Sequence, residues 1–338
     1  MPRLHASILV HTALLAAILS TTATAQSKRR LAYTDPKSAG PDYALQGEYL
    51  GAFVEDDRGL QVGLQVIANG GGKFAAVEYA GGLPGTGWNL RDRYKMSAEV
   101  RNGWIGLRSP RHRFRVMPDA AEILTPDGQF LGRLDKVHRV SPTLGRKPPR
   151  GAVVLFNGKD TRRFIRARMT KDGLLRDGAT FRDSYRDFTM HLEFQLPFMP
   201  FARGQGRGNS GLYIQNRYEL QILDSFGLEG AFNECGSLYR QRKPDLNLCL
   251  PPLQWQTYDI TFRSPRFDAA GKKTANARIT LRHNGVLVHD NVELTGNTGA
   301  ASRRPENAKL PPSVIQNHGN PVRFRNIWLI ETTGEPRA

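Results

Sequence analysis

The stretch with the clearest chemical potential lies near the middle of the chain, where polar and apolar residues alternate around a turn. Residues 208–224 read Gly-Asn-Ser-Gly-Leu-Tyr-Ile-Gln-Asn-Arg-Tyr-Glu-Leu-Gln-Ile-Leu-Asp. A hairpin that pairs Gln215 with Glu219 leaves a three-residue loop, and residues paired directly across two strands share a face. One face is then apolar, and the other carries the polar side chains of Tyr213, Gln215, Glu219 and Gln221. A two-residue loop would mix the two faces, so we predict a three-residue loop with Asn216 or Arg217 in a left-handed conformation.

Further strands with half-polar faces surround this hairpin in the second half of the chain. Residues 188–196 alternate, with His191 and Glu193 opposite an apolar face, and residues 255–263 alternate in the same way. Residues 277–290 predict a hairpin that turns at Asn284-Gly285. Antiparallel strands of this kind, from about residue 151 to residue 331, predict a two-sheet jelly-roll sandwich.

The first half of the chain predicts a separate and smaller β-rich domain. Short strands between Gly-rich turns run through residues 44–140, and no helical period of useful length interrupts them. Regular short strands favour a small β-barrel or sandwich. Residues 26–43 are predicted to be a flexible lead-in, and residues 141–150, which are rich in Pro and basic residues, are predicted to be an interdomain linker.

The first 25 residues predict a secretory signal peptide. Arg3 supplies a charged start, residues 8–19 are mostly apolar, and Ala23-Thr24-Ala25 is a small-residue cleavage signal. The apolar run is too short to span a bilayer. We therefore expect an exported protein, periplasmic or extracellular, that does not insert into a membrane. In an oxidising compartment Cys235 and Cys249, the two cysteines of the chain, would form a disulfide.

The formal net charge of the chain is +17. A nucleic-acid-binding protein needs a recognisable motif as well as positive charge, and the sequence contains none. We therefore expect no nucleic-acid partner. The basic residues form either a well-solvated surface or a surface attracted to anionic glycans and cell-surface polymers.

Several motifs occur in the order that is typical of one known family. The opening motif is Leu155-Phe156-Asn157-Gly158-Lys159-Asp160, and Asn209-Ser210-Gly211 precedes Tyr218-Glu219-Leu220-Gln221-Ile222-Leu223-Asp224. Trp255-Gln256-Thr257-Tyr258, His283-Asn284-Gly285 and His318-Gly319-Asn320-Pro321-Val322 follow. Residues 151–331 thereby resemble the 3-keto-disaccharide hydrolase-like family, also described as 3-keto-glucoside 1,2-lyase / 3-keto-2-hydroxyglucal hydratase. The resemblance implies a concanavalin A-like jelly roll and a glycoside or oligosaccharide substrate.

The resemblance also implies a reaction. A ketone at C3 of a sugar acidifies the C2 hydrogen, so that a base can start β-elimination of the C1 substituent, and water then adds to the product. Such a site needs a base, donors or a metal for the enolate oxygen, and an acid for the leaving group. Our hypothesis makes Glu219 or His318 the base and Glu193 the second carboxylate. Tyr213, Gln215, Gln221, Asn209 and Gln316 would bind the sugar.

Other readings of the same residues remain open. Glu193 could be a solvated or Arg-paired residue, and His318 could be purely structural. Two carboxylates, Glu193 and Glu219, would suit ordinary glycoside hydrolysis. A non-catalytic glycan-binding module is the third alternative. The family commonly has Asp where this chain has Asn317, and Asn317 can be neither a base nor a charged metal ligand. A divalent metal is compatible with the family, but no cofactor follows from the sequence.

Overall fold

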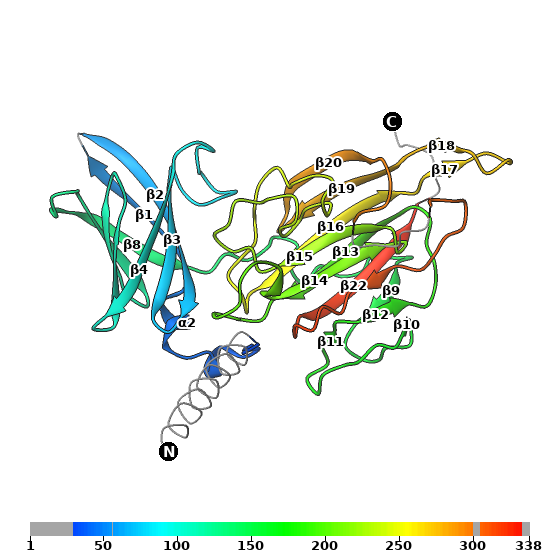
Figure 1. The fold of residues 1–338 in the computed structure, drawn as a ribbon, viewed down its shortest axis with the longest axis horizontal. Coiled ribbons are helices and arrows are strands. Elements are labelled where there is room, and N and C mark those ends of the chain that lie inside the picture. Colours follow the sequence, from blue (N-terminus) through cyan, green and yellow to red (C-terminus); the bar gives the residue numbers. More distant parts are fainter. Residues whose placement is uncertain (1–29, 56, 300–304, 333–338) are drawn as a thin grey trace, which may run out of the picture.

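The computed structural model describes residues 30–55, 57–299 and 305–332. A β-barrel and a β-sandwich lie next to each other along the long axis of the molecule (Figure 1). The predicted all-β class, a concanavalin A-like jelly roll preceded by a smaller β-rich domain, is confirmed. The predicted signal peptide lies outside the described residues. Among the described residues, no helix has the length and apolar character needed to cross a membrane.

Eight antiparallel strands close the first domain into a barrel. They are β1 (Gly47–Glu55), β2 (Arg58–Gly70), β3 (Lys73–Ala80), β4 (Arg93–Arg101), β5 (Trp104–Arg108), β6 (Arg113–Val116), β7 (Ala120–Leu124) and β8 (Phe130–Val137). Pairing of Glu48 with Val137 joins the last strand to the first. The interior is filled by alternating side chains such as Leu64, Val66 and Phe114, all of them buried. The barrel therefore has no unpaired edge.

Two sheets form the second domain. One has five strands in the order β10 (Phe164–Ile165), β12 (Ala179–Phe181), β21 (Val314–Ile315), β14 (Asn209–Ile214) and β15 (Tyr218–Leu223). The other has the order β11 (Leu175–Arg176), β22 (Arg323–Glu331), β13 (Phe188–Gln195), β16 (Trp255–Arg263), β19 (Ala277–His283) and β20 (Val286–Leu294), and β9 (Val153–Phe156) pairs with β22. A short ribbon of β17 (Arg266–Phe267) and β18 (Lys273–Ala275) stands apart.

The hydrophobic core of the sandwich lies between these two sheets. Leu212 and Leu220 of the five-stranded sheet belong to the same buried cluster as Leu192 and Phe194 of the seven-stranded sheet. Because neighbouring strand residues point to opposite faces, Tyr213 and Glu219 lie on the outer face of the first sheet and Glu193 lies on the outer face of the second. Each outer face is thus a separate place for polar side chains.

The central hairpin has the predicted loop length but not the predicted register. Tyr213 pairs with Glu219, and residues 215–217 form the loop between Ile214 and Tyr218. The pairing partners differ by two positions from those predicted, so every side chain keeps its predicted face except Gln215, which moves into the turn. Gln215 and Asn216 both take left-handed conformations, with φ of 49° and 48°. Two left-handed residues complete this tight turn.

Parts of the predicted flexible lead-in and of the predicted interdomain linker are packed against the sandwich. Tyr33 exchanges backbone hydrogen bonds of 2.9 Å with Phe198, followed by a short 3₁₀ turn (Pro36–Ser38) and the helix α2 (Pro41–Leu45). The predicted flexible lead-in is therefore wrong from Tyr33 onwards. Residues 141–146, here called the strap, cross the outer face of the seven-stranded sheet; there Ser141 Oγ lies 2.6 Å from Thr257 Oγ1. This part of the predicted linker is a fixed piece of the sandwich.

The predicted disulfide is wrong. Cys235 and Cys249 are both buried free thiols. Burial raises the pKa of the Cys249 thiol well above its usual range, so this thiol is neutral at physiological pH. The two cysteines act as small buried side chains between the loops that follow β15.

Candidate active site

The outer face of β14 and β15 gathers the polar side chains that the sequence predicted for the site. Glu219 lies opposite Tyr213, and Gln221 lies opposite Gly211. A Cβ atom at Gly211 would be 3.0 Å from Glu219 Oε1, so the absence of a side chain there leaves room beside the carboxylate. Glu219 is 2% exposed and Tyr213 is 8% exposed. The polar side chains of this face are therefore almost completely buried.

Burial changes the acidity of Glu219. Its removal from water raises its pKa to about 7, although the facing Tyr213 hydroxyl and the charge of Arg240 act in the opposite direction. Burial and the nearby Glu219 charge raise the pKa of Tyr213, which stays protonated. Glu219 therefore has the acidity of a general acid or base that works near neutral pH, and a phenol donor lies beside it.

Gln205 bridges the side-chain amides of Asn209 and Gln221. Its Oε1 accepts hydrogen bonds of 3.2 Å from Asn209 Nδ2 and from Gln221 Nε2. Its Nε2 donates to Asn233 O at 2.8 Å, which fixes its orientation. Sequence reasoning missed Gln205, because it lies in an irregular Gly- and Arg-rich loop with no strand periodicity to place it.

Three oxygens of this cluster have no hydrogen-bond donor among the residues that the structure describes. They are Asn209 Oδ1, Glu219 Oε2 and Gln316 Oε1, and each atom is buried. A buried acceptor without a donor costs about 1–3 kcal/mol. Sugar hydroxyl groups are donors that could satisfy several such acceptors at once. The cluster is thus prepared to accept hydrogen bonds from a polyhydroxy ligand.

Gln316 belongs to the cluster, but His318 does not contact it. The Gln316 backbone N–H donates to Gly211 O at 2.8 Å, and its side chain interacts with the Tyr213 hydroxyl. His318 is exposed two residues later, and the described residues provide it with no hydrogen-bond partner. Asn317 is also exposed, and its Oδ1 accepts the Gly319 N–H at 2.9 Å. Asn317 therefore stabilises a turn at the rim of the site.

Gln215 is not a sugar-binding residue. It is fully buried in the hairpin turn, where its Nε2 donates to Tyr185 O at 2.9 Å and to Ser264 Oγ. The prediction failed because the loop begins one residue earlier than expected. Gln215 holds the hairpin onto neighbouring loops and does not face the polar cluster.

Glu193 is not part of the site either. It lies on the outer face of the other sheet, where its oxygens accept hydrogen bonds from Gly145 N at 2.6 Å, Asn326 Nδ2 at 2.8 Å and Arg325 Nε at 2.6 Å. Burial alone would raise its pKa, but these donors and His191 lower the pKa to about 2. The predicted pairing of Glu193 with Glu219 is therefore wrong. Ordinary glycoside hydrolysis by these two carboxylates would lack its second carboxylate.

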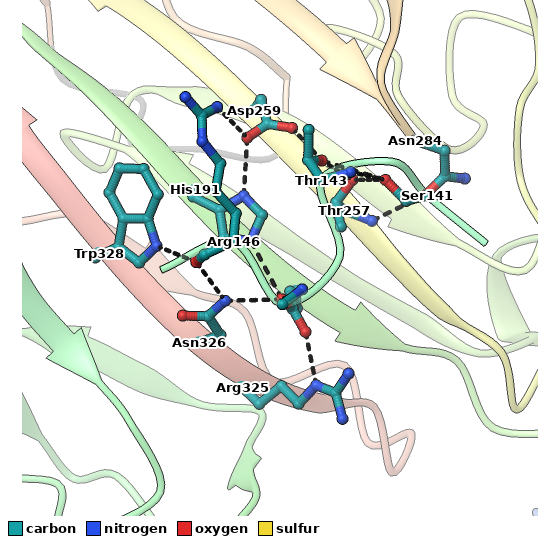
Figure 2. Close-up of polar contacts among 12 residues, drawn as sticks. Ser141, Thr143, Arg146, His191, Thr257, Asp259, Asn284, Arg325, Asn326 and Trp328 are labelled. Carbon is teal, nitrogen blue, oxygen red and sulfur yellow. Dashed lines mark hydrogen bonds and ion pairs between the residues drawn. The ribbon is translucent and has the colours of Figure 1, made fainter. Parts of the chain in front are cut away.

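The strap crosses this second polar face (Figure 2). His191 Nδ1 lies 2.8 Å from Asp259 Oδ1, and the His191 ring stacks on Trp328 with the ring centroids 5.4 Å apart. Thr143 Oγ1 donates to Asp259 Oδ2 at 2.6 Å, and Trp328 Nε1 donates to Arg146 O at 3.2 Å. Although burial acts to lower the pKa of His191, the two carboxylates raise it overall. The polar side chains of this face thus bond to one another and to the strap.

The side chains of the candidate site do not form a metal centre. Among the described residues, no group of three or more His, Cys, Asp or Glu side chains could hold a metal ion. The donor set around Glu219 is one carboxylate, several amides and a phenol. Ca²⁺ is usually held by several carboxylate and carbonyl oxygens, and Mg²⁺ by one or two carboxylates together with substrate oxygens. The cluster supplies a single anionic ligand and is not by itself a metal site.

A comparison with known protein families identifies the family of the sandwich domain. The model of the 3-keto-alpha-glucoside-1,2-lyase-like domain family matches residues 151–330. The chain belongs to this family. The matched residues begin just before β9 and end within β22, so they include the whole polar cluster on β14 and β15 and leave out the barrel and the strap.

Two solved structures are similar to the sandwich half of the chain. A "putative glycosyl hydrolase" from Parabacteroides distasonis ATCC 8503 is 29% identical, with a TM-score of 0.50, over 54% of this chain and 85% of that chain. A second structure of the same description and organism is 16% identical, with a TM-score of 0.40, over 54% of this chain and 94% of that chain. No curated protein matches the chain. The family and the first structure identify a carbohydrate-active protein.

Proposed function

We propose that this family member cleaves 3-keto-glycosides by β-elimination and hydration, with Glu219 as the base. The observation that carries the proposal is the Glu219 carboxylate, whose pKa is raised to about 7 by burial and whose Oε2 has no hydrogen-bond partner. A base that removes a carbon-bound proton works best when its pKa is near the working pH. The family match supports the choice of a 3-keto sugar.

The proposed steps follow from the chemistry of the substrate. Glu219 takes the proton from C2, and the electron pair of that bond forms an enolate with the C3 ketone. The C1–O bond then breaks, the leaving group departs with its electron pair, and a C1=C2 double bond forms. Water then adds its oxygen to C1 and gives up one proton, which the departed leaving group takes up. The Glu219 carboxyl exchanges its proton with solvent and protonates C2, and the C3 ketone is retained. The net result is hydrolysis of the glycoside.

The other residues of the cluster have binding roles in this proposal. The protonated Tyr213 hydroxyl is the donor for the enolate oxygen, which gains negative charge as the C2 proton leaves. Asn209, Gln221 and Gln316 accept hydrogen bonds from sugar hydroxyls. The unpartnered oxygens of Asn209 and Gln316 support these roles because bound hydroxyl groups would satisfy them.

The deciding experiment compares 4-nitrophenyl 3-keto-glucoside with 4-nitrophenyl glucoside in deuterated buffer, with and without EDTA. We expect release of nitrophenol from the keto sugar alone, together with deuterium at C2 of the product. Release from the unoxidised glucoside would contradict the elimination. Saturable binding of sugar without release from either substrate would make the domain a glycan-binding module. A loss of activity in EDTA would reveal a metal-dependent route.

We also propose that the protein is exported. The charged start, the apolar run and the small-residue sequence before Gln26 support this proposal. The mature N-terminus of protein expressed with its full leader can be read by mass spectrometry. We expect it to begin at Gln26, and a chain that keeps residues 1–25 in the cytoplasm would contradict export.

A further inference from the structure

A second candidate site lies where the barrel meets the sandwich, away from the polar cluster. It is a cavity of about 340 Å³, a size within the range of small-molecule sites. Most of its lining is apolar. The barrel contributes Ile67, Ala75, Val77 and Met96, and the sandwich contributes Phe226.

Specific contacts hold the two sides of the cavity together. Arg203 Nη2 donates to Asn69 O at 2.7 Å, and Lys95 Nζ lies 2.6 Å from Glu229 Oε1. Gly227 has φ of +73°, and a Cβ atom there would be 2.4 Å from Ile67 Cδ1. Only a glycine permits this close approach of the loop to the barrel. The barrel and the sandwich are therefore packed closely together beside the cavity.

One buried donor in the lining has no partner. Arg207 is 5% exposed; its Nε donates to Asp224 Oδ2 at 2.6 Å and its Nη1 donates to Ala68 O at 3.4 Å. Its Nη2 is buried without a hydrogen-bond partner. Leaving such a donor unpaired is unfavourable, and a ligand acceptor in the cavity would satisfy it.

The charges of the lining favour an uncharged ligand. The basic side chains are Lys95, Arg203 and Arg207, and the acidic ones are Asp224, Glu229 and Glu234. Arg207 is paired with Asp224 and Lys95 with Glu229, and Glu234 Oε2 accepts the Gly230 N–H at 2.7 Å. An ionic ligand would find no net opposite charge here. A neutral group with one oxygen acceptor matches both the apolar lining and the Arg207 donor.

The cavity is connected to the polar cluster through one loop. Arg203 and Gly204 line the cavity, and the next residue, Gln205, holds Asn209 and Gln221 in the cluster. Along the chain, Asp224 of the lining follows Glu219 by five residues, which corresponds to ~16 Å of extended strand. The cavity and the polar cluster are thus separate sites that share one loop.

We propose that the cavity is a second ligand site, and that it takes an uncharged, mostly apolar ring system with one hydrogen-bond acceptor. This proposal stands on the lining of the cavity and does not depend on the proposed elimination. The barrel, which the family match does not include, would then contribute to ligand binding.

Binding is tested with acetophenone and ethylbenzene, two neutral aromatic probes that differ by the carbonyl acceptor, on the full mature chain. We expect saturable binding of acetophenone and a shift of the Met96 methyl resonance in the NMR spectrum of the wild type. Ala75→Trp, which fills the cavity, should weaken binding at least tenfold, whereas Ala52→Trp on the exposed barrel surface should not. Arg207→Lys should weaken acetophenone binding about tenfold and ethylbenzene binding less than twofold. Without saturable binding or a Met96 shift in the wild type, the site is disproved.

Discussion

Two buried glutamates on opposite outer faces of the sandwich have opposite acidities. The pKa of Glu219 is raised to about 7, because burial outweighs its few polar neighbours. The pKa of Glu193 is lowered to about 2, because His191, Asn326, Arg325 and the Gly145 N–H outweigh burial. Both side chains are 2% exposed or less. Burial alone therefore does not decide whether the pKa of a carboxylate is raised or lowered. The number of hydrogen-bond donors around the carboxylate decides the direction.

The first prediction tests Glu219, the proposed base. Glu219→Gln keeps the shape of the side chain and removes the base. We expect the rate of nitrophenol release from the 3-keto-glucoside to fall about 10³-fold, within the range of 10²–10⁴ that a general base contributes. Glu293→Gln on the surface is the matched control and should retain full activity. A Glu219→Gln protein that keeps its rate would remove Glu219 from the mechanism.

The same substitution should stabilise the protein at alkaline pH. A folded-state pKa of about 7, above the usual 4.5, favours the protonated carboxyl. The contribution of the protonated Glu219 carboxyl to the stability of the protein is fully present below pH 4.5 and is lost as pH rises through 7. At pH 8 we expect Glu219→Gln to raise the free energy of unfolding by about 3 kcal/mol. Urea unfolding at pH 4 and pH 8 measures this difference, and an equal effect at both values would contradict the raised pKa.

Glu193→Gln should have the opposite effect on stability. The lowered pKa means that the Glu193 carboxylate contributes stability above pH 4.5 and loses it as pH falls toward 2. Removing the charge leaves Arg325 without its ion-pair partner, so we expect a loss of about 2 kcal/mol at pH 7. The loss should be smaller at pH 3. Activity per folded molecule should change less than twofold, and a large loss of kcat with unchanged stability would return Glu193 to the active site.

The pH dependence of the reaction tests the raised pKa of Glu219 without any substitution. Glu219 must be ionised to accept a proton, so kcat/KM should rise with pH and level off above about pH 7. Well below that value, each pH unit should lower kcat/KM tenfold. A rising limb centred near pH 4.5 would show that the reacting base has an ordinary carboxylate pKa. Initial rates from pH 5 to pH 9 distinguish the two cases.

Local patterns predicted the strands and their faces well. The strand Trp255–Arg263 and the turn at Asn284-Gly285 follow from alternation and from the left-handed conformations of the two turn residues. The outward placement of Tyr213, Glu219 and Gln221 was correct even though the register differed by two positions, because a shift of two residues preserves the faces of a strand. Periodicity therefore predicts which face of the sheet a residue occupies more reliably than which residue it pairs with on the neighbouring strand.

Properties that depend on contacts between distant segments could not be predicted in this way. Alternation placed Glu193 on a polar face but could not show that this face belongs to the other sheet and is covered by the strap. Gln205 comes from an irregular loop, and its link between Asn209 and Gln221 exists only in the folded chain. The closure of the barrel by β1 and β8 likewise joins residues far apart in sequence.

The strap has a practical consequence for how the sandwich is isolated. A fragment cut at residue 151, where the family match begins, would lack residues 141–146 and would open the buried side chains of His191, Glu193 and Asp259 to water. Pro142 also lies where a Cβ atom at Gly285 would be, at 2.4 Å from its Cγ, so the hairpin turn is shaped to receive the strap. The physical boundary of the sandwich is therefore residue 141, ten residues ahead of the boundary defined by the family.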